Sequence, residues 1–237
     1  MRPTLRSAGI AGIITGLALA GEFIFFFLSG FTPDKVADPA AALVFLRDNE
    51  LFLRAAVLFG AIGVAFRMVY VAGLSAKLSD KTPTYATGTL YFGVIGGVGH
   101  GLVALSYYIG FPLFIALAAS NQPAAVGSWG AFSAITSGFQ GFGNFLLGLM
   151  LLVAGWAMVS KRDLPAGAGA IGILAGLATL IGVFTTGTPV SSLGFAVFLP
   201  TFVLAIAFDL WVGVALLASE NRRSVGLPAE PELRRVA

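Results

Sequence analysis

A few polar side chains stand inside otherwise apolar runs of this chain. His100, the only histidine, lies in the run Tyr91–Gly110, and Glu22 and Asn144 lie in two others. At 1.5 Å per residue all three come to a similar depth, roughly 21 Å from one face of a bilayer. An imidazole beside a carboxylate in a low-dielectric site can shuttle protons near neutral pH. Glu22, His100 and Asn144, with Gln140 on the same run as Asn144, are therefore the candidate ligand or proton site.

Arg67 and Asp209 form a second set, each roughly 14 Å deep by the same count. An ionisable residue at bilayer depth costs about 2.5–3.5 kcal/mol on insertion scales, so such residues are functional hypotheses by default. For Arg67 and Asp209 we favour an intramembrane ion pair that clamps two helices; the alternative is a site for an ion or an anionic substrate. For Glu22 and His100 the alternative to a functional site is a hydrogen-bonded pair that holds the first and third spans together.

The residue inventory excludes several chemistries. The chain has no cysteine and one histidine, so a single copy cannot build a tetrahedral zinc site or a bis-histidine haem site. The four lysines lie at the ends of the apolar runs or in loops, which disfavours a buried Schiff base. No GxxxxGK[ST], HExxH or GxSxG motif occurs. The prediction is therefore no metal, no cofactor and no assigned catalytic residue.

Composition places these residues in a membrane protein. The chain is 57% hydrophobic and 11% charged, against about 25% charged residues in a soluble domain. The apolar residues come in blocks of the length that crosses a bilayer. The net charge is +3, but the basic residues cluster at the ends of these blocks and in the tails. They indicate a membrane surface rather than nucleic acid.

The blocks predict an all-α fold, a polytopic bundle of six transmembrane helices. The transmembrane domain covers about residues 1–220, and residues 221–237 form a disordered cytoplasmic tail. A cleavable signal peptide ending near Ala18-Leu19-Ala20 is the competing interpretation of the first block, but the block is long enough for a retained helix. The predicted spans are about 8–29, 51–76, 85–110, 129–160, 166–184 and 193–218.

Local signals refine these elements. Gly93, Gly97 and Gly101 have the four-residue spacing of a face that lets helices approach closely in lipid. Asp38 followed by proline is a helix-start signal, so a short interfacial helix should follow the first span. Pro112 should kink or end the third span.

Lysine and arginine predict the orientation. They occur in the N-terminal leader, in the turns at Lys77–Lys81 and Lys161-Arg162, and in the C-terminal tail, whereas the third-to-fourth and fifth-to-sixth connections carry no charge. Only the first loop is mixed, and its acidic residues Asp34, Asp38, Asp48 and Glu50 weigh little in this rule. We therefore expect both termini in the cytoplasm and the protein in the cell (inner) membrane.

Three segments together resemble a known family. A basic leader precedes an AGI-type first helix, and the acidic-aromatic sequence Asn49-Glu50-Leu51-Phe52-Leu53-Arg54 enters the second. The fourth and fifth spans read GNFLLGLMLLVAGWAMVSKRDLPAGAGAIGILAGLATLIG, a glycine-rich helix, a basic turn with proline, and a second glycine-rich helix. Over about residues 5–218 the chain resembles the bacterial integral-membrane family catalogued as DUF4386. That resemblance implies a six-helix membrane protein and carries over no catalytic residue.

Three functions stay open from the sequence. The first is binding or passage of a small apolar or ionisable ligand within the bundle, with the lipid bilayer and a small hydrophobic ligand or lipid as partners and no nucleic acid. The second is an intramembrane enzyme on a lipid-like substrate, with His100 and Glu22 as acid and base. The third is a structural or partner-binding subunit. The short loops and the missing catalytic motif weigh against the enzyme, and nothing in the sequence specifies an oligomeric state.

Overall fold

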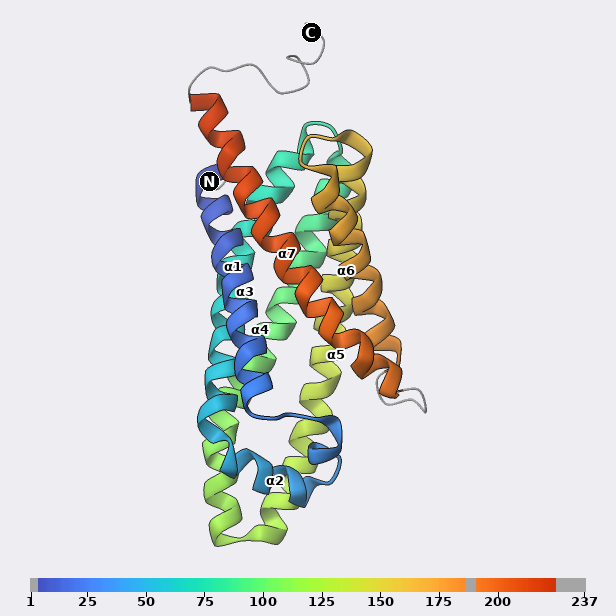
Figure 1. Cartoon of the computed structure of the whole chain (residues 1–237). Helices are drawn as coiled ribbons and strands as arrows, with labels where there is room; N and C mark the ends of the chain where they lie inside the picture. Colours follow the sequence, from blue (N-terminus) through green and yellow to red (C-terminus); the bar gives the residue numbers. More distant parts are fainter. Residues whose placement is uncertain (1–3, 186–190, 225–237) are drawn as a thin grey trace, which may run out of the picture.

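The computed structural model describes residues 4–185 and 191–224, and these residues form helices without any strand (Figure 1). The all-α fold predicted from the apolar blocks is confirmed. The elements in chain order are α1 (Leu5–Leu28), the 3-10 turn η1 (Pro33–Val36), α2 (Pro39–Asp48), α3 (Glu50–Ser79), α4 (Pro83–Ser120), α5 (Gln122–Lys161), α6 (Ala166–Thr185) and α7 (Ser191–Ser224).

The six long helices form a closed ring in chain order. Each packs against its neighbours along the sequence, and α7 returns to pack against α1. Helices α1 and α7 meet near the described ends of the chain, which lie at the same end of the bundle (Figure 1). The short helix α2 lies at the opposite end, where it contacts α3, α4 and α5. The interior faces of the ring therefore come from all six long helices.

Helix ends follow the local chemistry of the sequence. Asp38 caps α2 as expected, and its Oδ1 accepts the N–H of Ala41 at 2.8 Å. Asn121 caps α5 in the same way and accepts the N–H of Ala124 at 3.2 Å. Arg162 ends α5 in the left-handed conformation with φ 55°, which closes the turn into α6.

Pro112 does not end the helix that contains the third predicted span. Helix α4 continues through Pro112 to Ser120. A proline removes one backbone donor, and here the following turn is held by packing: Phe114 lies 5.3 Å from the ring of Trp129 and 5.0 Å from that of Phe132. Helix α5 correspondingly begins at Gln122 rather than near residue 129.

The α4–α5 hairpin is consequently longer than the bilayer needs. Helix α4 has 38 residues and α5 has 40, which is roughly 57–60 Å at 1.5 Å per residue, against a hydrocarbon core of about 30 Å. The hairpin extends beyond α1 and α3 at the end that carries α2 (Figure 1).

Helix α7 also extends further than the sequence predicts. Helix α7 runs to Ser224, so the first residues of the predicted tail, 221–224, are helical. The rest of that tail, the first residues of the leader and most of the α6–α7 turn lie outside the described residues.

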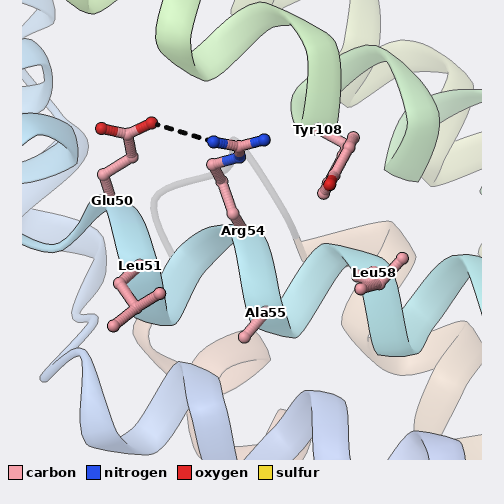
Figure 2. A pocket seen from close by; sticks show the side chains of 6 residues that line it. All are labelled: Glu50, Leu51, Arg54, Ala55, Leu58 and Tyr108. Atoms are coloured by element: carbon pink, nitrogen blue, oxygen red, sulfur yellow. Dashed lines mark hydrogen bonds and ion pairs between the residues drawn. The ribbon is translucent and has the colours of Figure 1, made fainter.

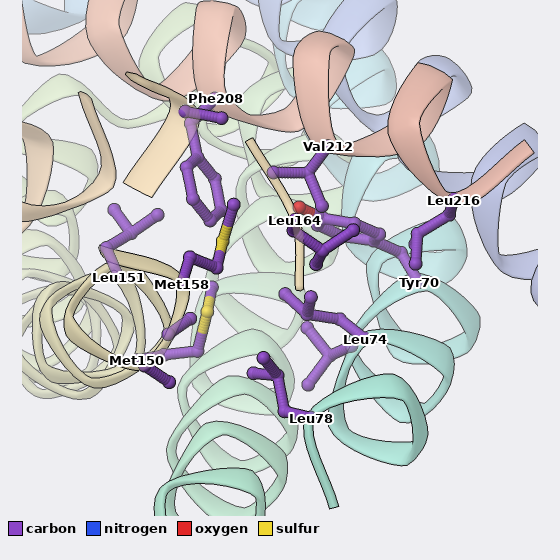
Figure 3. Packing of buried hydrophobic residues seen from close by; sticks show 14 of the residues in the cluster. Tyr70, Leu74, Leu78, Met150, Leu151, Met158, Leu164, Phe208, Val212 and Leu216 are labelled. Carbon is purple, nitrogen blue, oxygen red and sulfur yellow. The ribbon is translucent and has the colours of Figure 1, made fainter. Parts of the chain in front are cut away.

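A large apolar core fills the ring toward the end that carries the termini. Its largest members come from three helices: Tyr70 and Leu74 on α3, Met150 and Met158 on α5, and Phe208 on α7. Figure 3 shows these side chains meeting between the helices. This packing fixes the angular position of α3, α5 and α7, and it thereby decides which of their residues face inward.

A second cluster closes the opposite end. Leu43 and Phe45 of α2 pack with Leu53 of α3, Phe111 of α4 and Trp129 of α5. The predicted short helix after Asp38 thus lies across the end of the ring and is anchored by aromatic side chains.

The outside of the ring is apolar. Large hydrophobic side chains are exposed along every long helix, for example Phe27 at 74%, Leu113 at 64% and Phe184 at 68%. Within residues 4–185 and 191–224, six helices are long and apolar enough to cross a membrane. In water such a surface would be a large apolar patch; in lipid it is the expected covering. The chain is a multi-pass membrane protein.

Glycine sets the closest helix crossings. A Cβ at Gly96 would lie 2.9 Å from the carbonyl oxygen of Gly143, so α4 and α5 meet backbone to backbone. The predicted packing face is used differently: a Cβ would lie 2.6 Å from Val71 at Gly93, 2.9 Å from Met68 at Gly97 and 3.0 Å from Val64 at Gly101. These three glycines therefore admit side chains of α3.

Candidate functional site

His100 stands between two polar partners from other helices. Its Nδ1 lies 3.3 Å from Oδ1 of Asn144 on α5, and its Nε2 lies 3.9 Å from Oε1 of Glu22 on α1. The structure therefore brings together Glu22, His100 and Asn144, the three side chains for which the residue count predicts a similar depth in the bilayer. The cluster joins α1, α4 and α5 in the middle of the ring.

The protonation of this cluster is constrained by the amide. An amide oxygen only accepts, so in the tautomer that carries its hydrogen on Nδ1 the imidazole donates to Asn144. In a neutral imidazole Nε2 is then an acceptor, and it faces a carboxylate oxygen, which is also an acceptor. The Glu22–His100 contact is favourable only when a proton, or a donor from a third group, lies between the two.

All three side chains face the interior of the ring. On α4 the lipid-facing stripe includes Val98 and Leu102, and His100 is two residues from each, about 200° around the helix. By the same count Asn144 lies on the side of α5 opposite the exposed Phe142. Glu22 likewise lies on the side of α1 opposite the exposed Ile24. The His100 side chain is 15% exposed.

Gly60 makes the space for the carboxylate. A Cβ at this position of α3 would lie 3.0 Å from Oε1 and 3.1 Å from Oε2 of Glu22. Oε2 of Glu22 is buried and has no hydrogen-bond partner in the described part of the chain. A buried acceptor without a partner costs about 1–3 kcal/mol, more when it is charged, so Glu22 stands in this ring at a free-energy cost.

The second polar cluster has a different arrangement. Nη2 of Arg67 on α3 donates to Oδ2 of Asp209 on α7 at 2.8 Å. Both residues are buried, Arg67 at 8% and Asp209 at 1% exposed. The ion pair joins two helices that are not neighbours in the ring, across the inside of the bundle.

Polar atoms around this ion pair continue along α3. Tyr70 is one turn from Arg67 and completely buried. The Tyr70 hydroxyl, Oδ1 of Asp209 and Nε of Arg67 have no hydrogen-bond partner within residues 4–185 and 191–224. One turn in the other direction, the hydroxyl of Thr15 donates to carbonyl oxygens of Ala11 at 2.8 Å and Gly63 at 3.4 Å.

Gln140 is the candidate that the structure leaves outside the cluster. It lies one turn before Asn144 on the same inward face of α5 and is half-buried, but it does not join the hydrogen bond between Asn144 and His100. Among the described residues no group of three histidine or acidic side chains could hold a metal ion.

Two residues of these clusters were missed from the sequence. Tyr70 follows Arg67 by three residues, and this spacing on a helix puts it on the same face, so the signal was present. Gly60 precedes Arg67 by seven residues and shares that face too, but no local pattern distinguishes it from the many other glycines of the chain.

Fold and site define a class of protein: a six-span helical membrane protein with two interior polar clusters and no recognisable catalytic motif. Comparison with protein families then identifies it further. The model of the family described as "Domain of unknown function (DUF4386)" matches residues 14–217. The chain belongs to this family, which confirms the resemblance predicted from the sequence; the basic leader precedes the matched residues. No curated protein and no solved structure matches the chain.

Proposed function

We propose that the protein binds or passes a small, largely apolar ligand inside the helix ring, and that Glu22, His100 and Asn144 bind the ligand's polar group. The observation that carries this proposal is the Glu22–His100 contact at 3.9 Å. Two acceptors face each other there, and a hydrogen-bond donor between them would satisfy both. The expected ligand therefore carries an N–H, an O–H or a transferable proton.

The apolar part of the ligand has a matching surface. Tyr107 and Phe111 continue the face of α4 that carries His100, toward α2. Their rings lie 5.3 Å apart, and the ring of Phe132 on α5 lies 5.4 Å from that of Tyr107. The Tyr107 hydroxyl and the Thr136 side chain form a 2.9 Å hydrogen bond, so the polar tip of Tyr107 is already satisfied. Aromatic faces would then contact the ligand.

The test is mass spectrometry under native conditions of the protein purified in mild detergent, followed by solvent extraction of any bound molecule. The wild type is compared with Glu22→Gln, His100→Ala and Asn144→Leu. Thr179→Val is the matched control, because Thr179 is also an intramembrane polar residue but only donates to its own helix, to the Ala175 carbonyl at 2.7 Å.

We expect a bound small molecule in the wild type and the control, and much reduced retention in the three site variants. If proton exchange is part of the function, retention in the wild type should depend on pH, and the residual retention in Glu22→Gln should not. The absence of a bound molecule from all five proteins would contradict the proposal and leave the cluster as a contact between helices.

We further propose that both termini face the cytoplasm in the inner membrane. The basic turns support this orientation: Lys81 in the α3–α4 turn forms an ion pair with Asp163 in the α5–α6 turn, and both lie at the end that carries the termini (Figure 1). A cysteine at Asn121 should react with a membrane-impermeant reagent from outside, and one at Arg162 only after permeabilisation. The reverse labelling pattern would overturn the orientation.

A further inference from the structure

A groove between α3 and α4 combines charges of both signs with an apolar wall. Its volume is about 460 Å³, and it is lined by Glu50, Leu51, Arg54, Ala55, Leu58 and Tyr108. Figure 2 shows the guanidinium of Arg54 between the carboxylate of Glu50 and the ring of Tyr108. We propose that this groove binds one phospholipid with a zwitterionic amine headgroup, of the phosphatidylethanolamine class.

The position of the groove along the helices fits a headgroup. Arg54 and Tyr108 are both about 25 residues from the α3–α4 turn, roughly 37 Å along their helices. The hydrocarbon core is about 30 Å thick, and the headgroup regions bring the bilayer to about 40–45 Å. When the turn lies at one membrane surface, Arg54 and Tyr108 lie at the headgroups of the opposite leaflet, where tyrosine and arginine are frequent anchors.

The two charges match the two charges of the headgroup. Nη1 of Arg54 donates to Oε1 of Glu50 at 3.3 Å, which uses one of the five N–H donors of a guanidinium. An i,i+4 pair in which both side chains are about one third exposed contributes little to stability, so it can open readily. A lipid phosphate would then accept from Arg54, and its primary ammonium would donate to Glu50.

The remaining walls define the rest of the ligand. Arg54 lies over the ring of Tyr108, 4.8 Å from its centroid, which holds the guanidinium at the α4 side of the groove. Leu51 is 78% exposed and Leu58 is 44% exposed. Together with Ala55 they present an apolar surface that runs from the charged end of the groove toward the bilayer core. An acyl chain fits this surface, whereas a free water-soluble zwitterion would leave it uncovered.

The experiment measures lipid adducts by mass spectrometry under native conditions. The protein is exposed to equimolar phosphatidylethanolamine, phosphatidylcholine and phosphatidylglycerol with identical acyl chains. We expect phosphatidylethanolamine to be retained most, since only its ammonium carries N–H donors for Glu50 and phosphatidylglycerol brings an uncompensated negative charge. Arg54→Gln should lower its retention about tenfold, the effect of one lost charge-assisted hydrogen bond, and Arg54→Lys should lower it less.

Two further variants separate the contributions of the charges. Glu50→Gln should remove the preference for phosphatidylethanolamine and increase the retention of phosphatidylglycerol. Arg47→Gln is the matched control, because Arg47 forms a neighbouring pair with Asp48 at 3.0 Å, with side chains 63% and 54% exposed, and does not line the groove. It should leave the adducts unchanged, as should Glu22→Gln, so this test is independent of the interior site.

Three results would overturn the proposal. The first is equal loss in Arg54→Gln and Arg47→Gln, which would make the effect one of surface charge. The second is a preference of the wild type for phosphatidylglycerol. The third is displacement of the lipid by glycerophosphoethanolamine at equal concentration, which would show that the apolar wall of Leu51, Ala55 and Leu58 contributes nothing and that the ligand is a free zwitterion.

Discussion

Asp209 and Glu22 are both buried carboxylates on membrane-spanning helices, at 1% and 6% exposure, but their surroundings differ. Asp209 accepts a hydrogen bond from Arg67 at 2.8 Å. Glu22 has a histidine nitrogen at 3.9 Å and a second oxygen without a hydrogen-bond partner in the described residues. The two positions are roughly 10 Å apart along the bundle, seven residues of α3 separating Gly60 from Arg67.

The difference separates two uses of a charge in a membrane. The Arg67–Asp209 pair closes across the ring next to the well-packed core of Tyr70 and Phe208, where it joins α3 to α7. Glu22 and His100 do not close their contact, and Gly60 leaves the carboxylate its space. Each carboxylate keeps one oxygen without a hydrogen-bond partner in the described residues, so the difference lies in the direct contact. Asp209 has a hydrogen-bonded counter-charge at 2.8 Å, whereas the nearest cation candidate of Glu22, His100, is 3.9 Å away, as expected for a group whose partner a ligand supplies.

The largest expected effect is the loss of one partner of the clamp. Arg67→Leu leaves the Asp209 charge buried without a cation, and breaking such a pair costs about 3–5 kcal/mol. The double variant Arg67→Leu/Asp209→Leu removes both charges and should recover most of that stability. Thermal unfolding in detergent measures both; a double variant as unstable as the single one would contradict the clamp.

A smaller loss is expected from tight packing at the α1–α3 contact. A Cβ at Gly73 would overlap the side chain of Ala8, so Gly73→Ala must push α1 and α3 apart, and overpacking of this kind costs about 1–3 kcal/mol. The same unfolding assay tests it. Gly127→Ala on α5 is the control, because a Cβ there meets nothing within 4 Å. Equal stability of the two variants would show that the α1–α3 contact is loose.

Gly60→Ala should affect the site more than the fold. Its Cβ would lie 3.0 Å from the end of the Glu22 side chain, which is flexible enough to move by a few tenths of an ångström. We expect a stability change under about 1 kcal/mol, typical of a tolerated substitution, together with reduced retention of the bound molecule. Gly63→Ala, which meets Ala18 at 3.3 Å, is the control and should retain it. Equal retention in both variants would separate Glu22 from the ligand.

The smallest effect is expected outside the membrane. Asp163→Asn removes the ion pair with Lys81, whose side chain is half exposed at 53%, and exposed pairs contribute about 0–1 kcal/mol. The unfolding midpoint should therefore shift little, and increasing salt should abolish the shift. A loss as large as that of Arg67→Leu would mean that stability does not distinguish interior from surface pairs.

The depth of the interior residues in the bilayer could be predicted from the sequence, but their contacts could not. A helix rises by a fixed amount per residue, so counting from the basic ends put Glu22, His100 and Asn144 at one level and Arg67 with Asp209 at another. Which helices are neighbours depends on packing between distant segments, such as the backbone contact of Gly96 with Gly143, and no local spacing encodes it.

The same distinction explains the remaining differences. Pro112 is a strong local signal for a helix end, but the rings of Phe114, Trp129 and Phe132 hold α4 together beyond it. The headgroup groove also escaped the sequence, because Arg54 and Tyr108 meet only after α3 and α4 have packed side by side.

One measurement compares the two carboxylates directly: the unfolding midpoints of Glu22→Gln and Asp209→Asn, recorded side by side in the same detergent. The account predicts a large decrease for Asp209→Asn, because Arg67 loses its counter-charge. It predicts little change or an increase for Glu22→Gln, because a charge without a hydrogen-bonded partner is removed. A decrease for Glu22→Gln as large as that for Asp209→Asn would show that both carboxylates are structural.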